Sequence, residues 1–262
     1  MKYYDIFDNE NGYSVGTLLY FEREKVFIVE LADGLDEWTA PLLFTAYVKR
    51  GIFTIPRDVS LAWIRERIIP SNRQNINQIL KNHKLKEYDE IRFLEISEGK
   101  CSQDSIVIKK TEMLPEYVKK RMQHNLSEVV ISDDSLLAFF ADDTVRKLTF
   151  EKLYQIDGAE KLKSNRPLLE SGRVGAGGYY VTFNNSIDIP AAKLYKAGTK
   201  LPLTRSDFLN FVRKNILDTT EVCDILECSR QNLAYLINKD QLRPIKEDVK
   251  GNLYQKGDVL QM

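Results

Sequence analysis

The chain has 262 residues, enough for one large domain or two to three small ones, and its 43% hydrophobic and 29% charged residues are ordinary for a soluble globular protein. Its 38 Lys and Arg residues balance 38 Asp and Glu residues, which excludes a protein-wide basic field for gripping nucleic acid. The three cysteines have no CxxC spacing, which predicts free thiols. The polar start is unlike a signal peptide, and the apolar runs are too short to span a bilayer. We therefore expect a cytoplasmic protein without membrane contact.

The first predicted module, residues 1–115, mixes strands and helices. Residues 13–21 and 25–31 are rich in β-branched and aromatic side chains, and the charged turn between them predicts two strands. Residues 41–51 are apolar and fit either a strand or a helix that ends at Gly51. The sequence therefore favours an α/β module here.

An arginine-rich stretch, residues 62–75, follows in the same module. It predicts a helix that buries Trp63, Ile64 and Ile68. Two interpretations of its charged residues stay open, a solvated helix face or a surface that binds a protein or a phosphate backbone. The second interpretation makes three arginines possible partner-binding residues: Arg65, Arg67 and Arg73.

Residues 71–110 predict two further helices and a strand. Pro70 interrupts the first pattern, Ser71 is the expected N-cap of a helix through Ile76 and Leu80, and a second helix is expected at 88–96, before a strand at 105–110. The spacing over residues 60–108 resembles a motif of HipA-like kinases and other proteins of bacterial mobile elements, although no kinase catalytic loop follows. The matching positions are Arg67, Pro70, Arg73, Leu80, Leu85, Tyr88, Asp89, Gly99 and Asp104.

The second predicted module, residues 127–200, is an antiparallel β-meander with a helical insert. A connecting helix with Pro115 in its first turn comes before it. Paired Asp residues separate the expected strands 127–133, 135–142 and 144–150, and Asn184-Asn185 joins a later hairpin. The strand "DDTVRKLTF" and the hairpin "VTFNNSIDIP" resemble a small bacterial domain of unknown function that often accompanies a helix-turn-helix. That resemblance implies a fold and no chemistry.

The sequence favours no enzyme, cofactor or metal site. The two histidines have no partner at ligand spacing. The glycine-rich segment 170–178 lacks the Gly-Lys-Ser/Thr end of a phosphate loop and precedes a strand, so we expect a flexible connection there. No nucleophile stands in a recognised setting, so we predict that the chain is not an enzyme.

Residues 205–262 carry the strongest functional signal. An amphipathic helix at 206–216 is followed by a helix with a cap at 218–220 and an expected buried stripe of Val222, Ile225 and Leu226. After the joint at Glu227-Cys228, Ser229 caps a second helix that buries Leu233, Leu236 and Ile237. The opposite face carries side chains of the types that contact base edges: Arg230, Gln231, Ala234, Tyr235 and Asn238.

The residues after these helices predict a β-wing. Strands are expected at 242–246 and 253–255 around a turn at 250–252. Together the helix pair and the wing resemble the winged helix-turn-helix of MerR-type and excisionase-type proteins, although the arginine usual near residues 253–254 is missing. The expected DNA-binding residues are Ser229, Arg230, Gln231, Ala234, Tyr235, Asn238, Lys239, Lys246, Lys250 and Lys256.

The predicted fold is α+β, with two small mixed α/β modules followed by a C-terminal winged helix-turn-helix. The predicted function is a sequence-specific DNA-binding transcription regulator, an autoregulatory and antitoxin-like repressor of a mobile-element operon. We expect a homodimer on a palindromic operator in double-stranded DNA, with a protein partner bound by the N-terminal modules. The alternative is a protein-binding inhibitor or adaptor in which the helix-turn-helix is secondary.

Overall fold

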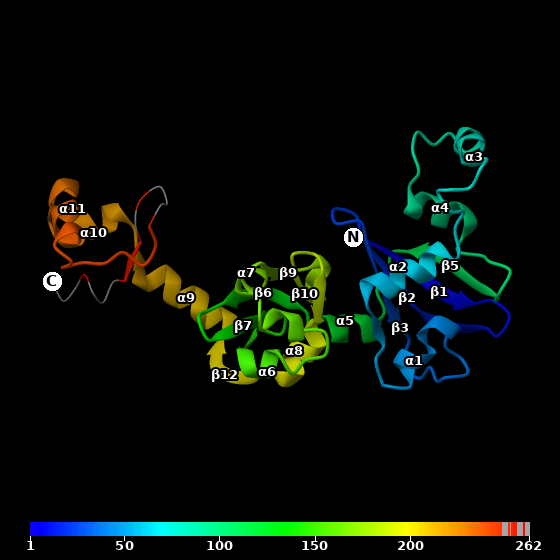
Figure 1. The fold of residues 1–262 in the computed structure, drawn as a ribbon, viewed down its shortest axis with the longest axis horizontal. Coiled ribbons are helices and arrows are strands. Elements are labelled where there is room, and N and C mark those ends of the chain that lie inside the picture. The colour runs from blue at the N-terminus through cyan, green and yellow to red at the C-terminus, as the bar shows by residue number, and fades with distance from the viewer. Residues whose placement is uncertain (248–250, 252, 256–258, 260–262) are drawn as a thin grey trace. The chain divides into compact units, whose positions relative to one another are not determined.

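The computed structural model describes residues 1–247, 251, 253–255 and 259 of a mixed α+β protein (Figure 1). The chain forms two compact units, the first comprising residues 1–142 and 148–198 and the second residues 143–147 and 199–262. None of the helices in the described part combines the length and hydrophobicity that crossing a bilayer requires.

The first unit begins with an antiparallel sheet in the order β4-β3-β2-β1-β5. Its strands are β1 (Lys2–Asp8), β2 (Tyr13–Phe21), β3 (Val26–Leu31), β4 (Thr54–Ile55) and β5 (Ile106–Thr111). The strands expected at 13–21 and 25–31 are confirmed. Sequence reasoning missed β1, which pairs with both β2 and β5 and therefore lies inside the sheet.

Helices cover one face of this sheet. They are η1 (Leu42–Phe44), α1 (Thr45–Val48), α2 (Arg57–Arg65) and α4 (Glu90–Ser97), and the segment between α2 and α4 contains α3 (Ile76–Asn82). Trp63 and Ile64 of α2 and Phe93 and Leu94 of α4 pack against Leu18 and other apolar side chains of the sheet. The expected burial of the apolar face of α2 is confirmed, and residues 42–48 prove to be helical.

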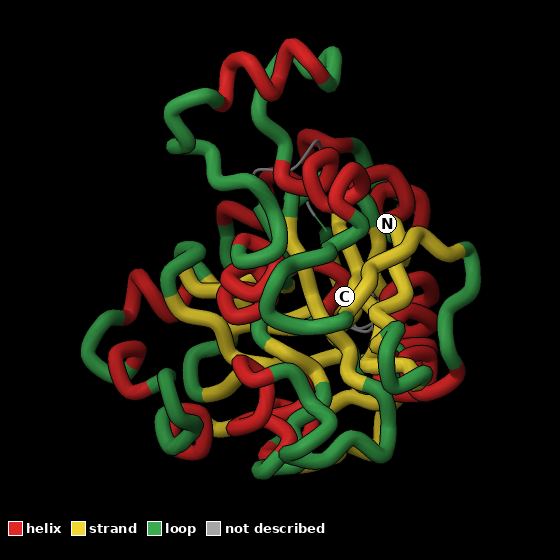
Figure 2. Tube along the Cα trace, turned by 90° about the vertical axis from the view of Figure 1, so that its right-hand side faces the viewer, coloured by secondary structure: helices red, strands yellow, loops and turns green. Residues whose placement is uncertain are grey.

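The segment around α3 is the exposed part of this module. No residue of α3 is buried, and α3 with its flanking loops projects from the sheet and the other helices of its unit (Figures 1 and 2). The cap expected at Ser71 is wrong, because the helix begins after Asn75. Ser71 instead lies in the turn that follows Pro70, so Pro70 separates α2 from α3 by more residues than the pattern suggested.

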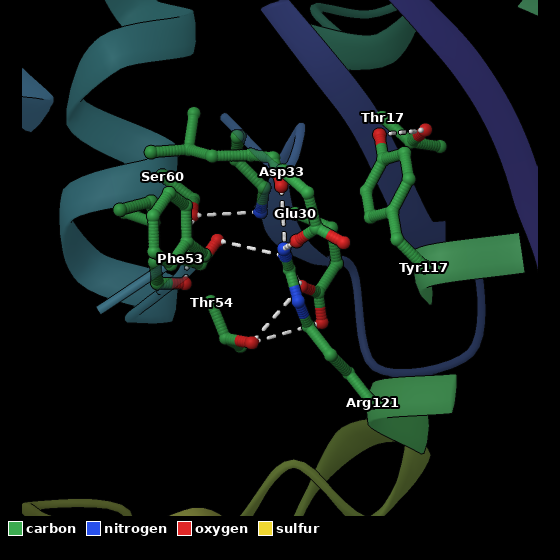
Figure 3. A network of polar contacts seen from close by, with 11 residues as sticks. Thr17, Glu30, Asp33, Phe53, Thr54, Ser60, Tyr117 and Arg121 are labelled. Carbon is green, nitrogen blue, oxygen red and sulfur yellow. Dashed lines mark hydrogen bonds and ion pairs between the residues drawn. The ribbon is translucent and has the colours of Figure 1, made fainter. Parts of the chain in front are cut away.

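The other face of the sheet is covered by α5 (Glu116–Met122) and by aromatic side chains from the second module. Pro115 is the N-cap of α5, one position before the expected one. From α5, the guanidinium of Arg121 donates to Glu30 Oε2 and to Leu31 O, each at 2.8 Å, and contacts Asp33 (Figure 3). The Glu30 side chain is fully buried, and burial raises its pKa while Arg121 opposes that rise. This buried pair attaches α5 to β3.

The second module begins with β6 (Leu126–Ile131), which pairs antiparallel with β7 (Ser135–Phe140). After β8 (Thr144–Thr149) comes the helical insert, with α6 (Phe150–Leu153), η2 (Glu160–Leu162) and α7 (Arg166–Glu170). The hairpin of β10 (Tyr180–Phe183) and β11 (Ile187–Pro190) turns at Asn184 and Asn185, both at positive φ, as a tight asparagine turn requires. The expected strands, insert and asparagine hairpin are confirmed.

The flexible connection expected at 170–178 is wrong. Residues Gly172–Val174 form β9, which pairs with β10, and Ala176–Gly178 form the short helix η3. Gly178 has φ +76°, and a Cβ there would lie 2.1 Å from the carbonyl oxygen of Leu126. The glycines therefore allow close backbone packing against β6, which a flexible linker does not need.

The second unit carries the C-terminal helices. Residues Thr199, Lys200 and Thr204 of β12 (Thr199–Thr204) pair antiparallel with the segment 144–147. Next come α9 (Arg205–Asn215), β13 (Ile216–Leu217), α10 (Thr219–Ile225), α11 (Arg230–Asn238) and β14 (Tyr254–Gln255). The small core of this unit consists of Leu217, Val222, Leu233, Leu242, Tyr254 and Val259. The helices expected at 206–216, after residue 218 and after Ser229 are present, and the first of them ends one residue early.

Candidate nucleic-acid interface

Helix α10 is fixed at its start by a reciprocal cap. Asp218 Oδ1 accepts hydrogen bonds from the backbone N–H groups of Thr220 and Glu221 at 2.7 and 2.9 Å. Glu221 Oε2 in turn accepts from the Asp218 N–H at 2.8 Å. A capping box of this kind satisfies N–H groups that the helix itself leaves unpaired, and its two carboxylates suit the positive end of the helix dipole.

The end of α10 is a Schellman turn. The Cys228 N–H donates to Cys223 O at 3.0 Å, the Glu227 N–H donates to Asp224 O at 3.4 Å, and Glu227 has φ 49°. These two bonds around one left-handed residue define the motif. The turn ends α10, and α11 begins directly after it at Arg230, with Ser229 as its N-cap.

Helix α11 has a buried and an exposed side. The Ser229 side chain accepts from the Asn232 N–H at 3.2 Å and so caps the helix, as expected. Leu233 is 2% exposed, and Leu236 and Ile237 are half-buried against the same core. The other expected DNA-facing residues of the helix are all exposed: Arg230, Gln231, Ala234, Tyr235, Asn238, and Lys239 after it.

The stripe expected on α10 is correct only in part. Val222 is fully buried and Leu226 is half-buried, whereas the Ile225 side chain is 39% exposed. Ile225 therefore lies outside the small core that Val222 shares with Leu217 and Leu233. The two cysteines at the turn, Cys223 and Cys228, are half-buried beside the core.

The segment after α11 differs from the expected wing. No strand forms at 242–246, where the described pairing is a single bridge between Lys246 and Leu253. The Ile245 N–H donates to Leu253 O at 2.6 Å, so the two segments do run antiparallel for a short distance. The main partner of β14 is β13, which immediately precedes α10. Sequence reasoning assigned Ile216 to a helix and therefore could not find this pairing.

Charge on this surface is unevenly distributed. Helix α10 and its ends carry Asp218, Glu221, Asp224 and Glu227, whereas Arg230, Lys239 and Lys246 lie exposed on α11 and beyond it. The Arg230 guanidinium contacts Thr220 Oγ1 at 3.4 Å, and the Lys239 ammonium lies 5.8 Å from the Tyr235 ring centroid. Lys250 and Lys256, two of the expected DNA-binding residues, lie outside the described residues.

The three possible partner-binding arginines of the first module do not form one surface. Arg65 is 60% exposed and pairs with Glu90 at 2.7 Å, and Arg73 is exposed beyond Pro70. The Arg67 side chain is only 3% exposed, so a partner-binding role for Arg67 is wrong. Its guanidinium forms a bidentate pair with Asp104 and stacks over the Trp63 ring at 4.1 Å.

Other positions of the same motif also hold the module together. Arg67 donates to Gly99 O at 3.1 Å, the Tyr88 hydroxyl donates to Ile69 O at 2.7 Å, and Asp89 caps α4 through the Ile91 N–H. A buried cation needs a paired carboxylate and hydrogen-bond acceptors, and Asp104 and Gly99 supply these to the two terminal nitrogens, whereas Arg67 Nε is buried without a hydrogen-bond partner. In this chain these motif positions therefore serve the structure of the module.

A surface hollow of about 690 Å³ lies elsewhere, beside β1, β5 and α4. Positive charge in its lining comes from Lys2, Arg92, Lys109 and Lys110, and negative charge comes from Glu95 and Glu98. Glu95 accepts from Tyr4 at 2.9 Å and from Arg92 at 3.2 Å, so its two oxygens are occupied within the fold. Among the described residues, no group of three or more His, Cys, Asp or Glu side chains is arranged to hold a metal ion.

No protein-family model, curated protein or solved structure matches this chain.

Proposed function

We propose that the chain is a sequence-specific DNA-binding regulator and that α11 is its recognition helix within a winged helix-turn-helix. One observation carries the proposal: α11 is capped and packed on one side while its other side exposes Arg230, Gln231, Ala234, Tyr235 and Asn238. Arginine pairs with guanine, Gln and Asn pair with adenine, and an apolar or aromatic side chain contacts the thymine methyl. The short β13–β14 ladder supports the arrangement, because it attaches the segment after α11 to the start of α10.

A regulator of this kind gains specificity by binding as a pair. One such helix reaches only a few base pairs, so a two-fold homodimer on a palindromic operator supplies the missing contacts. The first unit, which lacks an excess of basic charge, would then serve partner binding or oligomerisation. An autoregulatory, antitoxin-like role in a cytoplasmic repressor fits this division of labour.

Selection from random double-stranded DNA by the full chain tests the proposal. We expect enrichment of a palindrome, and a combined Gln231→Ala and Asn238→Ala variant should bind the enriched DNA at least tenfold more weakly, because each lost bidentate pair costs about 1–3 kcal/mol. Fluorescence anisotropy measures the affinities, and circular dichroism checks that the variants are folded.

The matched control is Asn232→Ala. Asn232 is exposed on the same helix but lies about 100° or more from Gln231 and Asn238 around the helix axis. This variant should bind as the wild type does. A wild-type chain that enriches no sequence would refute DNA recognition, and equal losses in control and double variant would refute the assigned face.

A second candidate is a protein-binding adaptor, favoured by the loop before η1. The Trp38 side chain in this loop is 86% exposed, and the Leu42 side chain at the start of η1 is 92% exposed. Asp36 Oδ1 accepts from the N–H groups of Trp38 and Thr39 at 2.9 Å each, which holds the loop in one conformation. Exposed aromatic anchors on a preorganised loop are typical of protein interfaces. This candidate replaces the first if the selection enriches no DNA sequence and the wild-type chain binds a protein that the Trp38→Ala variant does not bind.

A further inference from the structure

The turn between α10 and α11 brings two thiols together. Cys223 and Cys228 occupy the positions of a Schellman motif whose side chains normally contact one another. Their backbones are joined by the 3.0 Å hydrogen bond from the Cys228 N–H to Cys223 O, which limits the separation of their Cα atoms to about 7 Å. Native disulfides span roughly 4.4–6.8 Å between Cα atoms, so the turn already holds these residues near bonding distance.

Both thiols are accessible to a small oxidant. Each cysteine is half-buried at the margin of the core of the second unit, so that part of its surface is in contact with solvent. The third cysteine, Cys101, belongs to the first unit, where its sulfur lies 3.6 Å from Asp104 Oδ1 and from Arg67 Nη1. The pair is therefore distinct from Cys101 in its surroundings as well as in its position.

We propose that Cys223 and Cys228 form a reversible disulfide that locks the turn between α10 and α11, with a peroxide as the oxidant. In the first step the Cys228 thiolate attacks a peroxide oxygen, the O–O bond breaks, and the thiol becomes a sulfenic acid as hydroxide leaves. In the second step the Cys223 sulfur attacks the sulfenic sulfur, the S–S bond forms, and the hydroxyl leaves as water with the Cys223 proton. The sum converts two thiols and one hydrogen peroxide to one disulfide and two waters.

The order of attack follows from the surroundings of Cys223. Burial and the neighbouring Cys228 thiol raise the pKa of Cys223, which keeps its proton in place at neutral pH. Cys223 therefore serves as the resolving thiol, which reacts after the sulfenic acid has formed beside it. A resolving thiol so close prevents further oxidation to sulfinic acid.

Hydrogen peroxide treatment of the full chain tests the site directly. We expect the count of titratable thiols to fall from three to one, the intact mass to lose two hydrogen atoms, and peptide mapping to show the Cys223–Cys228 link. Dithiothreitol should restore all three thiols. Hydrogen exchange at the amides of Glu227 and Cys228 should slow at least tenfold in the oxidised chain.

Three variants provide the controls. Cys101→Ser should oxidise as the wild type does, whereas Cys223→Ser and Cys228→Ser should form no internal disulfide. In Cys223→Ser, without its resolving thiol, Cys228 should proceed to sulfinic acid. Persistence of both thiols in the wild type, or a link that involves Cys101, would overturn the proposal.

The consequence for DNA binding rests on the proposed function. A lock that preserves the native turn should leave the affinity for selected DNA equal or higher in the oxidised chain. Loss of binding on oxidation would refute that consequence, although the mass would still show the disulfide. If the chain forms the disulfide but binds DNA in neither state, the result refutes the proposed DNA recognition and supports the disulfide.

Discussion

At the scale of single residues, Arg67 shows how burial decides the role of a charged side chain. Its neighbour Arg65 lies two residues earlier on the same stretch, yet the Arg65 side chain is 60% exposed and that of Arg67 is 3% exposed. The guanidinium of Arg67 lies between the Trp63 ring and Asp104, which is itself 32% exposed. Burial raises the pKa of Asp104, but the hydrogen bonds and charge of Arg67 and the hydrogen bond from the Ile106 N–H bring it below its usual value. The pair therefore remains ionised at neutral pH.

Replacing Arg67 should destabilise the first module much more than replacing Arg65. Arg67→Met removes the pair with Asp104 and leaves Gly99 O without its donor, at an expected cost of about 2–3 kcal/mol, since Asp104 can still be hydrated in part. Arg65→Met breaks a surface pair and should change the free energy of unfolding by less than about 0.5 kcal/mol. Urea denaturation of the two variants measures the difference. Similar losses in both would contradict the structural role of Arg67.

At the scale of elements, the glycine-rich segment 172–178 acts as a packing device of the second module. β9 extends the β10–β11 hairpin, and η3 passes so close to β6 that Gly178 leaves no room for a side chain. Asn125, just before β6, donates from its side chain to Gly177 O at 2.9 Å and holds the contact from the other side. Two segments far apart in sequence are joined in this way at backbone distance.

A pair of glycine variants separates close packing from backbone strain. Gly178 and Gly158 both have positive φ, at +76° and +91°, but only Gly178 has a backbone atom where its Cβ would lie. Gly158→Ala should cost about 1–2 kcal/mol from conformation alone. Gly178→Ala should cost at least about 3 kcal/mol or prevent folding, because the Leu126 carbonyl cannot move aside. Thermal unfolding followed by circular dichroism distinguishes these outcomes, and equal melting temperatures for the two variants would refute the packing role.

At the scale of the whole molecule, balanced charge limits how the protein can bind DNA. The chain carries 38 basic and 38 acidic residues, and six basic residues lie between Ser229 and Lys256. Helix α10 and its ends carry four acidic residues and no basic residue. In the proposed DNA complex, attraction to phosphates would therefore come from a small, local set of side chains, and base contacts would supply the rest of the affinity.

The salt dependence of DNA binding should reveal the size of this set. If all six basic residues contact phosphates, the plot of log affinity against log salt concentration should have a slope of roughly −5 per copy of the chain. Lys239→Gln should make that slope shallower by about 1, since it removes one phosphate contact. Anisotropy titrations between low and moderate salt measure both slopes. A much steeper slope would show that basic residues outside this set contact DNA.

The sequence by itself determined the elements whose signals are local. Runs rich in β-branched and aromatic residues, divided by a charged turn, predicted β2 and β3. Paired turn residues predicted the meander and the asparagine hairpin, and capping residues predicted α10 and α11. The exposed face of α11 was predicted from helical periodicity. The positions of the apolar side chains determine which face of a helix is buried, and the opposite face is then exposed. What the chain does with that face remains a proposal.

The tertiary structure alone decided the features that depend on distant residues. Burial of Arg67 needed Asp104, the close packing of Gly178 needed Leu126, and the short strand β13 needed β14, some forty residues later. The sequence did not predict β1, because its polar and aromatic residues form a strand only through pairing with β2 and β5. In each case the deciding partner lies far along the chain, where local periodicity and capping patterns carry no information.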